Sequence, residues 1–141
     1  MMRSIALIGI IVLCAGAYII SAAESYTYDK DITPVLSQNG CVGCHNWADS
    51  YDGIISKVST SSQTKGIPIV TPAKPDSSVL VWRLDGKLPS GAGIGIMPMG
   101  EDKLDDAVIT KVREWIAQGA PESVVGVEDA RRWGEIKSLF R

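Results

Sequence analysis

Cys41, Cys44 and His45 carry the clearest chemical signature in the chain, within the stretch NGCVGCHNW. Two thiols separated by two residues, with an imidazole directly after them, can serve four kinds of chemistry. They can exchange thiols and disulfides, bind zinc, form a structural disulfide, or attach a haem through two thioether bonds. Each of these sites needs different partners, so the rest of the sequence discriminates among them.

The chain lacks the partners that the first three sites need. A redox-active C-x-x-C belongs to a thioredoxin-like βαβ pattern, which does not occur here. Zinc takes four ligands, and after residue 23 no further Cys or His is present. A disulfide would leave His45 unexplained. The motif therefore predicts one covalently attached haem c, with thioethers at Cys41 and Cys44 and with His45 as the proximal iron ligand.

The ligand at the sixth iron position is predicted from the small number of histidine and methionine residues in the chain. His45 is the only histidine, so a second histidine ligand within the chain is excluded. Methionine is the remaining common ligand, and beyond the first residues only Met97 and Met99 occur, both in the Gly/Pro-rich stretch at 86–100. If neither bound iron, the open position would favour a five-coordinate sensor or peroxidase, although a peroxidase would lack its distal histidine.

A short helix is predicted directly before the Cys–His motif, in DKDITPVLSQNG at 29–40. Ile32, Val35 and Leu36 follow the i, i+3, i+4 spacing of one helix face. Gly40 is typical of the residue that ends a helix. This helix would lead the chain into the motif.

The strongest helical pattern covers residues 104–119, LDDAVITKVREWIAQG. Four of its residues form one apolar stripe: Val108, Val112, Trp115 and Ile116. Shorter helices are predicted at 51–58 and at 77–84, the latter capped by Asp76 or Ser77, with a strand as the alternative.

Two long stretches, 59–76 and 86–100, are rich in Gly, Pro, Ser and Thr and predict irregular loops. The fold class expected is therefore all-α, with three to five short helices joined by long loops. Such a domain has a thin core, so a group other than side chains is expected to fill its middle.

These motifs resemble those of class I c-type cytochromes, small monohaem electron carriers. The resemblance covers residues 29–121 and rests on DITPVLSQNGCVGCH, IMPMG and VREWIAQGAPE. It implies a cytochrome c-like fold in which the last helix crosses the first. It also implies Met97, which precedes Pro98, as the distal ligand, with Met99 as the alternative.

The same resemblance implies a function: transfer of single electrons between redox partner proteins, without catalysis of its own. Trp82 and Arg83 are candidate neighbours of the haem propionates. The net charge of −2 and the scattered Lys and Arg residues exclude nucleic acid as a partner.

The N-terminus predicts export. Residues 4–23 are uncharged, between Arg3 and Glu24, which fits a signal peptide cleaved after Ala23 or a retained membrane anchor. Either one places the rest of the chain in the periplasm or on the outer face of the cytoplasmic membrane. A retained anchor would favour the alternative of a haem subunit fixed in a larger electron-transfer complex.

Three regions follow from these patterns: a leader at 1–23, a haem domain at 24–121 and a C-terminal extension at 122–141. The extension has the apolar spacing of an amphipathic helix over 127–140. It would either fold back on the domain or dock onto a partner.

Overall fold

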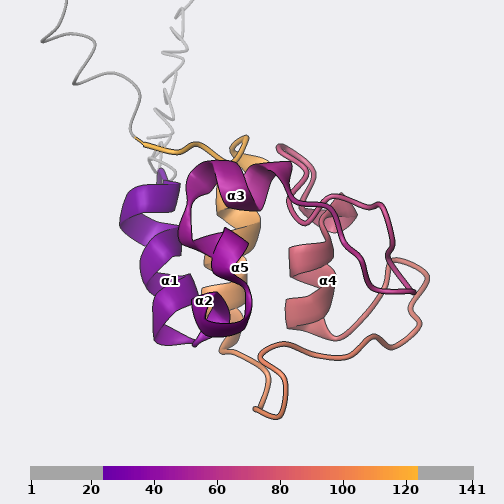
Figure 1. Cartoon of the computed structure of the whole chain (residues 1–141). Helices are drawn as coiled ribbons and strands as arrows, with labels where there is room; N and C mark the ends of the chain where they lie inside the picture. The colour runs from indigo at the N-terminus through magenta and orange to yellow at the C-terminus, as the bar shows by residue number, and fades with distance from the viewer. Residues whose placement is uncertain (1–23, 124–141) are drawn as a thin grey trace, which may run out of the picture.

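The computed structural model describes residues 24–123, in which short helices are joined by long loops (Figure 1). The α-helices, in chain order, are α1 (Thr33–Gln38), α2 (Cys41–Cys44), α3 (Tyr51–Ser56), α4 (Val79–Asp85) and α5 (Asp106–Ala117). Shorter 3₁₀ or π turns are η1 (Tyr28–Ile32), η2 (Asn46–Asp49) and η3 (Pro75–Ser77). Within these residues β pairing is confined to two isolated bridges, Val58–Pro68 and Lys87–Gly93. The all-α prediction is confirmed.

The helix predicted before the Cys–His motif is present, and η1 continues directly into α1. Thr27 caps it: its hydroxyl accepts a hydrogen bond from the Lys30 amide, and its own amide donates to the Asp31 carboxylate at 2.8 Å. The three residues of the predicted apolar face, Ile32, Val35 and Leu36, are all buried. Gly40, with φ 68°, follows its end, because the left-handed conformation costs glycine little.

Helix α5 stands between the α1–α3 group and α4 (Figure 1). It is shorter than predicted, and its buried face contains Ile109 where the sequence pattern had placed Val108, which is only half-buried. Ile109, Val112 and Ile116 follow the i, i+3, i+7 spacing of one helix face, and Val108 lies at the edge of that face, packed partly buried against the core.

Trp115 of α5 joins the two ends of the described chain. Its indole N–H donates to the Pro121 carbonyl at 2.9 Å, and its ring lies 6.0 Å from that of Tyr28. The Tyr28 amide also donates to the Pro121 carbonyl, and the Asp29 amide donates to that of Glu122. The segments before α1 and after α5 are therefore fastened to each other.

Two parts of the fold are distinguished below. The helical frame consists of residues 24–56 and 106–123, and the connecting segment consists of residues 57–105, with η3 and α4. All the α-helices except α4 belong to the helical frame.

Helix α4 is the one regular helix of the connecting segment, and the alternative of a strand at this position is wrong. Its N-cap is Ser78, not Asp76 or Ser77 as predicted. The Ser78 hydroxyl bonds outside the helix instead of capping it: it accepts from the Thr71 amide at 2.9 Å and donates to the Lys74 carbonyl at 3.0 Å. The side chain thus fastens the preceding loop to the start of α4.

Arg113 links α5 to both ends of the α4 region. Its guanidinium donates to Asp76 at 2.7 Å and to Asp85 at 2.6 Å. These two carboxylates, Asp76 first, raise the pKa of Arg113 above its ordinary value. The ion pairs hold α4 against α5 of the helical frame.

The predictions for the leader at 1–23 and for the helix at 127–140 lie outside the described residues. Among residues 24–123 no helix is both long enough and apolar enough to cross a membrane.

Candidate functional site

The Cys–His motif lies on a tight bend of the helical frame. Because Gly40 is left-handed, α2 begins in a new direction immediately after α1. Cys41 and Cys44 lie one helical turn apart on α2, and His45 follows. The His45 amide donates to the Cys41 carbonyl at 2.9 Å, so the last bond of the helix fixes the histidine backbone.

A pocket opens between this bend and α4. Its empty volume is about 880 Å³, part of which is open to solvent. Its apolar wall comes from α1, α3, α4 and the loop before α4: Leu36, Ile54, Ile69, Val79, Leu80 and Leu84.

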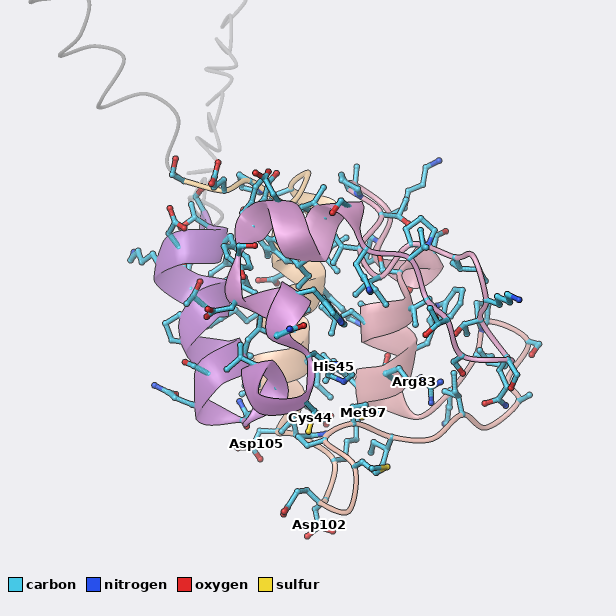
Figure 2. The ribbon with its side chains drawn as sticks, in the orientation of Figure 1. Cys44, His45, Arg83, Met97, Asp102 and Asp105 are labelled. Atoms are coloured by element: carbon cyan, nitrogen blue, oxygen red, sulfur yellow. The ribbon has the colours of Figure 1, made fainter. Side chains whose placement is uncertain are left out.

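The pocket brings together three of the residues singled out from the sequence. Cys41, His45 and Met97 all line it, although Met97 comes from the second long loop. Cys44 is exposed and lies beside it, in the same space between α2 and α4 (Figure 2). Met99 is 83% exposed and does not line the pocket.

Trp47 is a site residue that the sequence reasoning missed. Its ring lies 5.1 Å from that of His45 at an interplanar angle of 48°, and it also lines the pocket. The Lys57 ammonium lies 5.9 Å from the Trp47 ring centroid. The position of Trp47 in the sequence, two residues after His45, was the one sign that could have identified it as a site residue. Within residues 24–123, the His45 ring makes no hydrogen bond, so its nitrogens remain available as ligands.

The two candidate propionate neighbours lie in different places. Arg83 lines the pocket, and its guanidinium donates to Ser61 Oγ at 2.7 Å and to the Gly95 carbonyl at 3.0 Å. Trp82 does not line the pocket, and its indole N–H donates to the Asp76 carbonyl at 2.9 Å.

The two thiols differ in exposure: Cys41 is partly buried and Cys44 is exposed. Both cysteines are free, and burial raises the pKa of the Cys41 thiol, which disfavours the reactive thiolate. Among the described residues, no cluster of three or more His, Cys, Asp or Glu side chains could hold a metal ion. The pocket is lined by one thiol, one imidazole and one thioether around an apolar space, and the Cys44 thiol lies outside this lining. This donor set fits a thioether-linked haem with two axial ligands.

Comparisons with protein-family models, with curated proteins and with solved structures found no match. Function is therefore inferred from the residues of the pocket.

Proposed function

We propose that this protein carries single electrons between redox partner proteins through one c-type haem. Thioethers at Cys41 and Cys44 would attach the haem, and His45 and Met97 would bind its iron from opposite sides. The observation that carries the proposal is that one apolar pocket is lined by Cys41, His45 and Met97, which belong to different parts of the fold.

The walls of the pocket suit this role. A haem bound there would supply an iron that gains and loses one electron. The aliphatic wall excludes water and lowers the local dielectric, which favours the less charged reduced state. Met97, a soft and neutral ligand, would act in the same direction. Lys57 and Arg83 line the same pocket and would suit the anionic groups of the ligand.

The exposed Cys44 leaves one edge of the pocket at the surface. Electrons would enter and leave at this edge, through the small, weak contacts that suit a carrier. We place the protein outside the cytoplasm, in the periplasm or on the outer face of the membrane, because of the leader at 1–23.

The arrangement of helices supports a cytochrome c-like fold as part of the proposal. A helix precedes the Cys–His motif, a loop bears the methionine, and the last described helix packs on the first through Trp115 and Tyr28. These are the features that class I c-type cytochromes share.

The axial ligand is tested by Met97→Ala, with Met99→Ala as the matched control. Wild-type oxidised protein should show the far-red methionine-to-iron charge-transfer band, and its reduced form should bind carbon monoxide slowly. Met97→Ala should lose the band and bind carbon monoxide fast and stoichiometrically. Met99→Ala should resemble wild type, since Met99 is exposed. Fast carbon monoxide binding by wild type would contradict the carrier function and favour the five-coordinate sensor.

The attachment is tested by intact mass. The purified chain should carry one haem that survives denaturation, and Cys41→Ala with Cys44→Ala should abolish it. The same spectrum decides the fate of the leader: a mass lacking residues 1–23 means a cleaved signal and excludes the anchored-subunit alternative.

A further inference from the structure

Arg83 makes an unusual set of contacts around the loop that bears Met97. Its guanidinium Nη1 donates to the Gly95 carbonyl at 3.0 Å, and its own carbonyl accepts from the Met97 amide at 2.9 Å. The short stretch from Gly95 to Met97 is thus bonded at both ends to one residue of α4.

The same guanidinium reaches the other long loop. Nη2 donates to Ser61 Oγ at 2.7 Å, and Ser61, Arg83 and Met97 all line the pocket. Figure 2 shows Met97 between Cys44 and Arg83 in the view, with His45 next to it. One side chain therefore connects α4 with both loops of the connecting segment.

The Gly95 backbone lies close to the Arg83 guanidinium. A Cβ added at Gly95 would lie 3.2 Å from Arg83 Nη1, tighter than ordinary van der Waals contact, so the guanidinium would have to shift slightly to admit it.

We propose that Arg83 is a positioning residue that holds Met97 in the pocket, an inference that rests on the proposed function. Its contacts with Gly95 and Ser61 determine how readily Met97 leaves the pocket and, in the haem-loaded protein, how readily an external ligand replaces it. Without the guanidinium, the Met97 loop would keep its backbone bonds, among them the one from the Met97 amide to the Arg83 carbonyl and the one from the Ile94 amide to the Gly86 carbonyl, but it would lose its side-chain link to α4.

A different role for Arg83 is to supply positive charge to an anionic group of the ligand. The two roles respond differently to Arg83→Lys. Lysine keeps the charge but lacks the planar fork that reaches Gly95 and Ser61 together. A positioning role therefore predicts only partial rescue by lysine, whereas a charge role predicts full rescue.

The test uses the full chain with Arg83→Ala and Arg83→Lys, and with Arg113→Ala as the matched control. Arg113 also donates to two partners and lies against α4, but it does not line the pocket. One readout is the rate of oxidation of Met97 by dilute peroxide, relative to exposed Met99 in the same molecule. The second is the rate at which imidazole binds the oxidised haem-loaded protein.

We expect Arg83→Ala to raise both rates at least about tenfold, since two hydrogen bonds from a charged donor are lost. Arg83→Lys should fall between Arg83→Ala and wild type, and Arg113→Ala should match wild type in both. Equal changes in Arg83→Ala and Arg113→Ala, or full rescue by lysine, would overturn the proposal. A wild-type chain without haem would end the proposed function, but the Met97 oxidation ratio would still decide whether Arg83 holds Met97.

Discussion

The helical frame and the connecting segment are held together in different ways. The frame is built of helices whose buried side chains pack around Trp115 and Tyr28, and its ends are joined by backbone hydrogen bonds. The connecting segment has one regular helix, and single side chains such as Ser78 and Arg83 hold its loops.

The two candidate iron ligands in the pocket come from different parts of the fold. His45 belongs to the helical frame, where a helix end fixes its backbone, whereas Met97 belongs to the connecting segment and depends on contacts with α4. Loops with little regular structure open more easily than packed helices. We therefore expect changes in the frame to alter global stability and changes in the connecting segment to alter the placement of Met97.

The largest effect is expected from Trp115→Ala, with Trp82→Ala as the control. Both indoles donate to a backbone carbonyl, but Trp115 is fully buried in the frame and Trp82 is only partly buried in the connecting segment. Trp115→Ala should destabilise the protein by about 3–5 kcal/mol, and Trp82→Ala by much less. Urea unfolding followed by far-ultraviolet circular dichroism measures both. Equal losses would show that the two parts are equally packed.

An intermediate effect is expected from Gly53→Ala, with Gly43→Ala as the control. A Cβ at Gly53 would collide with the Trp47 carbonyl, so the backbone next to His45 must shift. At Gly43, in α2, no atom lies within 4 Å of an added Cβ. Gly53→Ala should cost about 1–3 kcal/mol, whereas Gly43→Ala should be neutral or slightly stabilising.

Urea midpoints and near-ultraviolet circular dichroism of the tryptophans measure this pair. A neutral Gly53→Ala would mean that the backbone around Trp47 yields easily, and the frame would then be no firmer than the connecting segment.

The smallest effect is expected from Tyr28→Phe, and it should depend on pH. The Tyr28 hydroxyl donates to the Ala48 carbonyl at 2.8 Å, and burial is the main reason that its pKa is raised. A raised folded pKa contributes stability that is complete below the unfolded value of about 10 and is lost as pH rises above it. Phenylalanine should therefore cost about 1 kcal/mol at neutral pH, and the deficit should shrink above about pH 10.

Urea unfolding at about pH 7 and about pH 11 checks this expectation. Tyr51→Phe, which removes a hydroxyl that donates to the Ala120 carbonyl, controls for the loss of a hydroxyl in the frame. An identical Tyr28→Phe deficit at both pH values would contradict the assigned cause.

The parts of the fold that local pattern determines were predictable. The spacing of Ile32, Val35 and Leu36 identified a buried helix face, and Gly40 identified its end, because both depend on residues within a few positions of each other. The Cys–His motif and the scarcity of histidine and methionine pointed to residues that line one pocket.

The parts that depend on distant contacts were not predictable in the same way. The hydrogen bonds from Arg83 to Ser61 and Gly95 join loops that have no periodic hydrophobic pattern. The local sequence therefore gives no sign of these bonds. The cap of α4 was misplaced because Ser78 bonds to a neighbouring loop. Trp47 was passed over because its importance comes from the packing of its ring, tilted by 48°, beside that of His45.

The backbone bonds that join Tyr28 and Asp29 to Pro121 and Glu122 also have a mechanical consequence. The two ends of the described chain lie on the side of the molecule far from Cys44 (Figures 1 and 2). A force that pulls the two ends apart would act first on these hydrogen bonds and on the Trp115 contact. The pocket would not be strained. A molecule tethered at either end to a solid electrode would turn its Cys44 edge toward solution.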